Sequence, residues 1–232
     1  MKRKLISVVI ITFFVITISS AQKSDVNDTE ASYFNEDGKI LGIGMVELDL
    51  EQNYFGKDII IYNVKGKTKV VIRVTVSDVT TKMGGKLYSL NNQPNPFLPR
   101  YFGNNPDYFR LIFDCVRVTS QFYEVVIDQT TNETGFIKKS DSLFKFKTVM
   151  QYVDEWTSLG LSFDRSQNPL KLEPSDHAKD VYYDNHERNK IESAEKIEMK
   201  GDWMKIKTQN KLEGWIRWKR DNTIVIQIYF AC

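Results

Sequence analysis

The chain has 232 residues, and its 32 Lys and Arg residues nearly balance its 30 Asp and Glu residues, for a formal net charge of +2. This length allows one large domain or two small ones, and a hydrophobic content of 41% is ordinary for a globular protein. A near-neutral chain lacks the positive field on which nonspecific nucleic-acid binding depends, so we exclude nucleic acid as a partner.

The N-terminus has the pattern of a secretory signal peptide. Basic residues at positions 2–4 precede an apolar run at positions 5–18, and Ser19, Ser20 and Ala21 follow. The alternative, an uncleaved anchor, is disfavoured because this run is short for a bilayer span. We expect cleavage after Ala21, which leaves a periplasmic or extracellular protein with no stable membrane insertion and a net charge of about −1.

Residues 22–50 are expected to form an N-terminal extension, and residues 51–145 a first β module. Apolar and polar side chains alternate in KTKVVIRVTVSD (67–78), the period-two pattern of a strand, and FRLIFDCVRVTS (109–120) predicts another. The stretch NQPNPFLPRYFGNNP (92–106) is interpreted as an insertion loop of this module. Its P-x-x-P spacing leaves a polyproline ligand as the alternative.

A short helix is predicted between two β modules. In TVMQYVDEWTSLG the residues Val149, Val153 and Trp156 recur at helical spacing, Thr148 is suited to cap the start, and Gly160 the end. Because so short a helix is marginal in isolation, its apolar stripe is expected to pack on one module or both. We therefore assign residues 146–164 to a helical linker and residues 165–232 to a second β module.

The second module contains a hairpin, residues 201–222, whose side chains alternate between two faces. The alternation predicts that aliphatic side chains face the core while both tryptophans and neighbouring basic residues share the outer face. The inward set is Met204, Ile206 and Ile216, and the outward set is Trp203, Lys205, Trp215 and Arg217. EKIEMKG is expected to supply the preceding strand with Ile197 and Met199 inward, and TIVIQIYF the closing strand.

The first module contains a near-copy of this hairpin. In QFYEVVIDQTTNETGFIKKSD (121–141), Phe122 corresponds to Trp203 and Phe136 to Trp215. The two aromatic residues are 14 positions apart in the first copy and 12 in the second, a difference that a turn can absorb. The sequence therefore predicts a tandem repeat of small β modules.

GDWMKI followed by EGWIRW resembles the bacterial SH3-like domain, and FYEVVI followed by TGFIKK resembles it in the first copy. The resemblance implies a mainly β protein of two small SH3-like barrels joined by the helical linker. DIIIYNVKGKTKVV and NPLKLEPSDHAKDV would then supply the opening strand and long loop of each barrel.

In that family the aromatic residues at the two hairpin positions line a ligand groove. The resemblance therefore implies ligand contacts at Trp203, Trp215, Phe122 and Phe136, and alternation adds Lys205 and Arg217. A noncatalytic exported module that binds peptides or cell-wall fragments is the expected function. The alternative is a structural or assembly protein whose aromatic faces pack between modules or against a partner chain.

We find no catalytic constellation, and we expect no enzyme, cofactor or metal. Cys115 lies within an apparent strand with no nearby feature to lower its pKa, and Cys232 is terminal. Whether these cysteines pair is left open. The loop SDHAKDVYYDNHERN gathers potential metal ligands, but their spacing matches no closed motif. They are Asp176, His177, Asp180, Asp184, His186 and Glu187.

Overall fold

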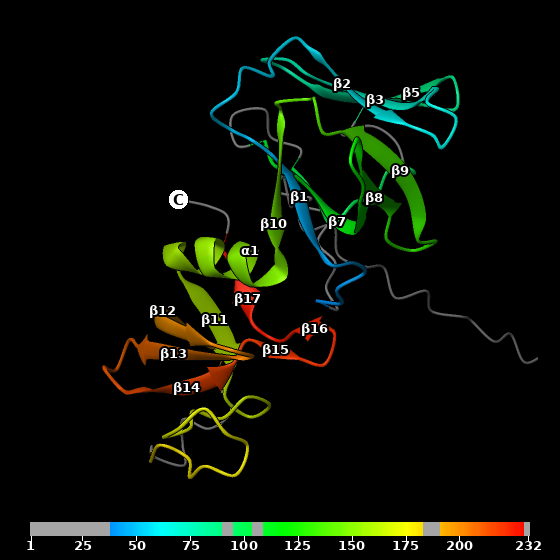
Figure 1. The fold of residues 1–232 in the computed structure, drawn as a ribbon. Coiled ribbons are helices and arrows are strands. Elements are labelled where there is room, and N and C mark those ends of the chain that lie inside the picture. Colours follow the sequence, from blue (N-terminus) through cyan, green and yellow to red (C-terminus); the bar gives the residue numbers. More distant parts are fainter. Residues whose placement is uncertain (1–37, 90–94, 104–108, 183–190, 230–232) are drawn as a thin grey trace, which may run out of the picture.

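The computed structural model describes residues 38–89, 95–103, 109–182 and 191–229. The signal peptide, Cys232, Asp184, His186 and Glu187 lie outside these ranges. The described residues form antiparallel sheets with a single α-helix among them, which confirms the mainly β class (Figure 1).

The larger sheet contains ten strands among the described residues, in the order β10-β1-β7-β8-β9-β2-β3-β4-β5, with β6 beside β7. These strands are β1 (Gly44–Leu48), β2 (Asp58–Tyr62), β3 (Thr68–Val74), β4 (Val79–Met83), β5 (Lys86–Ser89), β6 (Tyr101–Phe102), β7 (Leu111–Val118), β8 (Phe122–Asp128), β9 (Glu133–Lys138) and β10 (Phe144–Thr148). The strands predicted at 67–78 and 109–120 are β3 and β7.

The smaller sheet has the order β14-β13-β12-β11-β17, and β15 pairs with β16 in a separate ribbon. These strands are β11 (Leu161–Asp164), β12 (Ile191–Lys200), β13 (Trp203–Thr208), β14 (Glu213–Arg217), β15 (Lys219–Arg220), β16 (Thr223–Ile224) and β17 (Gln227–Ile228). The closing strand predicted at 223–230 is thus divided between β16 and β17.

The same strand order occurs twice. We define the first unit as β1, β7, β8, β9 and β10, and the second unit as β11, β12, β13, β14 and β17. In each unit the last strand pairs with the first, and the second, third and fourth follow on the other side. The two hairpins that the sequence predicts to be copies, β8–β9 and β13–β14, hold the same place in this order. Both described sheets run as open paths rather than closed barrels.

The units begin at different residues from those expected. β1, the opening strand of the first unit, lies within the segment predicted to be an N-terminal extension, and β11 lies within the predicted linker. DIIIYNVKGKTKVV instead forms β2 and β3, which belong to an insertion between the first and second strands of the first unit.

Helix α1 (Val149–Trp156) begins at Thr148, whose side chain accepts from the Gln151 N–H while the Gln151 side chain accepts from the Thr148 N–H. This reciprocal capping box satisfies donors that the first turn leaves free. A 3₁₀ turn, Thr157–Leu159, follows the helix, and Gly160 ends that turn at φ +117°, where a glycine is favoured.

The helix is part of a hydrophobic core that draws on both units. Its buried residues Tyr152, Val153 and Trp156 cluster with second-unit residues such as Ile206. The same cluster includes three residues from the first-unit side, Ile40, Met45 and Ile112. Figure 1 shows α1 between β10 and the smaller sheet. A second, separate hydrophobic cluster is formed by side chains of the larger sheet, such as Val46, Ile72 and Ile137.

Candidate functional site

The register of β13 and β14 confirms the predicted faces of the second hairpin. Trp203 pairs with Arg217 and Lys205 with Trp215, so these four side chains lie on one face. Met204, Ile206 and Ile216 lie on the other face, within the shared core.

Both tryptophans on the outer face are nevertheless covered. Trp203 is 8% exposed and Trp215 is 9% exposed, although neither belongs to a core cluster. The Arg217 guanidinium carbon lies 4.5 Å from the centre of the Trp203 ring, a stabilising cation–π contact. The open groove expected at these two residues is therefore not found on this hairpin.

The segment after β11 covers the outer face. The Lys171 N–H donates to the Trp215 carbonyl over 2.7 Å, and the Trp215 N–H donates back over 2.8 Å. Asn168 forms a similar two-way contact with the Arg217 backbone. These bonds hold residues 168–171 alongside β14. Lys171, which pairs with Trp215, and Asp176, which bonds to Arg217, then add side chains to the face that carries the tryptophans.

Two candidate metal ligands take part in this covering segment. Asp176 accepts from the Arg217 Nε over 3.0 Å, and the Lys171 ammonium lies 2.7 Å from Asp180. The hydrogen bond from Arg217 lowers the pKa of the Asp176 carboxyl. The described residues contain no cluster of three or more metal-ligating side chains. The ion pairs with Arg217 and Lys171 therefore account for the positions of Asp176 and Asp180.

The corresponding face of the first unit is more open. Phe122 and Phe136 are both half-buried, and their rings meet edge to face with centroids 6.3 Å apart. Tyr62 pairs with Phe136 across β2 and β9, and the Lys138 ammonium lies 4.5 Å from the centre of the Tyr62 ring. We call Tyr62, Phe122, Phe136 and Lys138 the aromatic face.

The outer faces of the two hairpins differ in exposure because the segment beside the fourth strand is arranged differently in each unit. In the first unit β2 continues the sheet beyond β9 at Phe136. In the second unit the segment meets β14 at the equivalent Trp215, but its side chains Asn168 and Asp176 then bond across to Arg217. Tyr62 could not be predicted as part of this face, since a tyrosine at the end of an apolar strand carries no signal that the strand pairs with β9, more than 70 residues later.

Cys115 lies within β7, as predicted, and is a free, fully buried thiol. Burial raises the pKa of this thiol to about 11, so very little thiolate exists at neutral pH. The open question of a Cys115–Cys232 disulfide is answered for Cys115, which is unpaired in the structure.

The P-x-x-P segment is packed into the fold. Phe97 is fully buried, and the Leu98 N–H and carbonyl bond to Ile127 and Gln129. Arg100 forms a buried ion pair with Asp114 at 2.8 Å. These contacts favour the insertion-loop interpretation over a polyproline ligand.

Comparison with models of protein families, with curated proteins and with solved structures finds no match to this chain. Across the described residues, no helix has the length and apolar character needed to cross a bilayer.

Proposed function

We propose that the chain is a noncatalytic exported binding protein built from two SH3-like units joined through helix α1. Its binding surface is the aromatic face of the first unit, which engages a peptide or a cell-wall fragment. The observation that carries this proposal is the half-exposed Phe122–Phe136 pair, in contrast to the covered Trp203 and Trp215.

The repeated strand order supports the SH3-like part of the proposal. In each unit the last strand, β10 or β17, returns to pair with the opening strand, and a long segment separates the first and second strands. The hairpins that carry the family-like residues occupy the third and fourth strands in both units. The sequence motif and the strand order therefore identify the same hairpin in each unit.

The composition of the aromatic face supports binding of an extended, polar ligand. Half-exposed aromatic rings offer apolar area at low entropic cost, and the exposed Lys138 adds a positive charge beside them. Nearby charges on these and adjacent strands are already paired, since Arg117 lies 2.8 Å from Glu124 and Lys69 lies 2.7 Å from Glu133. The rings, and Lys138, whose ammonium lies over Tyr62, are therefore the groups that a partner can contact.

Co-sedimentation with purified peptidoglycan sacculi, beside a screen of immobilised extended peptides, tests the proposal. We expect wild-type protein to bind one of these probes and both Phe122→Ala and Phe136→Ala to lose most of that binding while remaining folded. Leu87→Ala is the matched control, because Leu87 is 66% exposed on β5 of the same sheet but lies away from the aromatic face. Binding that survives both phenylalanine substitutions would refute the assignment.

A structural or assembly role is the second candidate, and the burial of Trp203 and Trp215 favours it. In the second unit the predicted ligand residues Trp203, Trp215 and Arg217 are used to hold the covering segment. Under this reading neither hairpin binds a ligand, and substitutions in both units change stability alone. The sedimentation experiment distinguishes the two candidates. Only for a binding protein should the phenylalanine variants stay folded and yet no longer sediment with the sacculi.

A further inference from the structure

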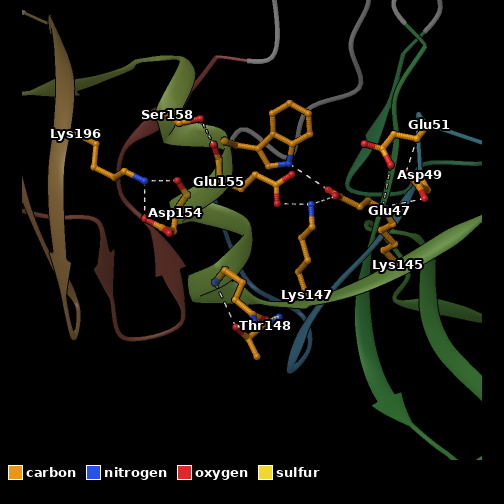
Figure 2. A network of polar contacts seen from close by, with 12 residues as sticks. Glu47, Asp49, Glu51, Lys145, Lys147, Thr148, Asp154, Glu155, Ser158 and Lys196 are labelled. Atoms are coloured by element: carbon orange, nitrogen blue, oxygen red, sulfur yellow. Dashed lines mark hydrogen bonds and ion pairs between the residues drawn. The ribbon is translucent and has the colours of Figure 1, made fainter.

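A charged surface lies on the side of β10, β1 and β7 that faces helix α1. Along β1, Val46 and Leu48 point into the first core cluster, so Glu47 points to the opposite side. On β10 the same alternation places Lys145 and Lys147 on Glu47's side. Figure 2 shows Glu47, Lys147 and Glu155 directed toward one another between strand and helix, with Asp49, Glu51 and Lys145 beside them.

This surface borders a cleft of about 220 Å³, lined also by Arg110 and Trp156. Pockets for drug-sized ligands usually measure roughly 300–1,000 Å³, so the cleft suits a smaller molecule. It lies between the first unit and the helix, and shares no residue with the aromatic face.

Most charged groups in the cleft already have partners within the chain. Lys147 bridges Glu47 and Glu155, and the Trp156 Nε1–H donates to Glu47 over 3.1 Å. Asp49 is paired with Lys145 at 2.9 Å and also accepts from the Glu51 N–H. The buried carboxylates Glu47 and Asp49 are therefore satisfied.

Arg110 is the exception. Its guanidinium carbon lies 4.8 Å from the centre of the Trp156 ring. Its Nε and Nη1 atoms are buried and have no hydrogen-bond acceptor among the described residues. Buried donors without acceptors cost free energy, and a carboxylate is the acceptor that a guanidinium binds most strongly in proteins. Arg110 lines the cleft and its side chain is only partly buried, so a carboxylate in the cleft can approach the guanidinium and, with a small shift of that side chain, bond to these donors.

The charge of the walls selects among carboxylate ligands. Four carboxylates and three cations line the cleft, so a purely anionic ligand meets an acidic surrounding. Glu51 has an 85% exposed side chain and lies 3.9 Å from Lys145, and Glu155 is 56% exposed. Each of these carboxylates is paired with a lysine of the chain, but each is exposed enough for a positive group on the same ligand to approach its oxygens as well.

We propose that this cleft binds a small zwitterionic ligand, of the amino-acid or short-peptide class, with its carboxylate at Arg110 and its ammonium at Glu51 and Glu155. The site is separate from the aromatic face and does not depend on the function proposed for that face.

Isothermal titration of the full chain with alanyl-alanine tests the proposal, with N-acetyl-alanyl-alanine and alanyl-alanine amide as comparison ligands. We expect the dipeptide to bind and each blocked form, which lacks one of the two charges, to bind at least about tenfold more weakly. Arg110→Gln should weaken dipeptide binding by a similar factor, and Leu87→Ala, on β5 and outside both surfaces, should leave it unchanged.

Glu51→Gln keeps the test decisive if Arg110→Gln does not fold, because an 85% exposed side chain contributes little to folding. We expect Glu51→Gln to weaken the dipeptide but not its N-acetylated form. Absence of heat with the dipeptide at two temperatures, or equal binding of the dipeptide and both blocked forms, overturns the proposal. Unchanged binding in a folded Arg110→Gln variant overturns it as well.

Discussion

Val116 and Ile197 are equivalent residues, because each is the unpaired residue of a β-bulge at the same place in its unit. In the first unit Cys115 pairs with Val125 and Arg117 with Glu124, which leaves Val116 without a partner. In the second unit the pairs Lys196–Ile206 and Glu198–Lys205 leave Ile197 without one. The two units thus share an irregularity as well as a strand order.

The bulge explains why one sequence prediction is wrong. Strict alternation placed Ile197 toward the core, but its side chain is 45% exposed, and Val116 is similarly 37% exposed. A bulge inserts one residue into a strand and redirects the side chains around it. Met199, beyond the bulge, does pack against the shared core as predicted.

The shared core gives a prediction about cooperativity. Ile206→Asp places a charge at a fully buried position, which costs at least several kcal/mol. Because this cluster also contains Ile40, Met45 and Ile112 from the first-unit side, we expect both units to lose stability together. Calorimetry should show one transition at a much lower temperature than in the wild type.

Lys205→Asp is the control for that substitution. Lys205 is the next residue along β13 but faces outward, with a side chain 33% exposed and 3.7 Å from Glu213. The reversal removes this surface pair and adds a repulsion with Glu213, each worth no more than about 1 kcal/mol, which is far less than the cost expected at Ile206. Comparable damage from Lys205→Asp and Ile206→Asp would show that the strand faces are reversed.

Cys115 should react with thiol reagents only when the protein unfolds. The thiol is fully buried, and burial raises its pKa to about 11, so both access and thiolate concentration are low at pH 8. Labelling with a disulfide reagent in a Cys232→Ser background measures this residue alone. We expect the labelling midpoint in urea to coincide with the unfolding midpoint. Rapid labelling of native protein would contradict the buried position.

The ion pair between Asp176 and Arg217 predicts a loss of stability in acid. The hydrogen bond from Arg217 lowers the pKa of Asp176 below its ordinary value of 3.8. A carboxyl with a lowered folded-state pKa stabilises the protein fully above its unfolded pKa, and this contribution is lost as pH falls through the folded pKa. Asp176→Asn should therefore flatten the fall in melting temperature below about pH 4.

Glu173→Gln serves as the comparison, since it removes one negative charge from the same segment without touching Arg217. We expect its melting temperature to follow the wild-type pH profile. An Asp176→Asn profile that also matches the wild type would mean that the pair with Arg217 contributes nothing to folding.

The features that could be predicted from the sequence are those encoded by nearby residues. The hairpin faces follow from period-two alternation within six residues, and helix α1 from Thr148 and three apolar positions. β1 was missed although apolar and polar residues alternate through Val46, Glu47 and Leu48, because so short an alternation is a weak signal of a strand. All five of its residues, including the charged one, are buried. Its buried Glu47 is explained only by Lys147, Glu155 and Trp156, which are far away in the sequence.

The exposure of the candidate site could not be predicted for the same reason. Trp203 and Trp215 are covered by a segment whose bonds to β14 join residues 49 positions apart, such as Asn168 and Arg217. The alternation of side chains along a strand predicts which face each side chain occupies. It does not predict whether another part of the chain lies over that face. The Arg110 cleft likewise brings together residues from the first unit and the helix, with no motif in any one segment.

Truncation of either tryptophan of the second unit should destabilise the protein. Trp203 and Trp215 are each less than a tenth exposed, so their truncation removes nearly a whole buried indole and leaves a cavity behind. We expect Trp203→Ala and Trp215→Ala each to cost ~3–5 kcal/mol of unfolding free energy. Trp203→Ala also removes the ring beneath Arg217, which loosens the covering segment through Asp176.

Urea denaturation followed by circular dichroism measures both variants, with Phe136→Ala as the matched truncation on the first hairpin. Phe136 holds the equivalent position but is only half-buried, so its loss should cost less than either tryptophan. The tryptophan variants should be the less stable ones because the outer face of the second hairpin is covered, whereas that of the first is open. If instead both tryptophan variants are as stable as Phe136→Ala, the segment at residues 168–176 does not cover Trp203 and Trp215 in solution, and the second hairpin returns as a binding surface.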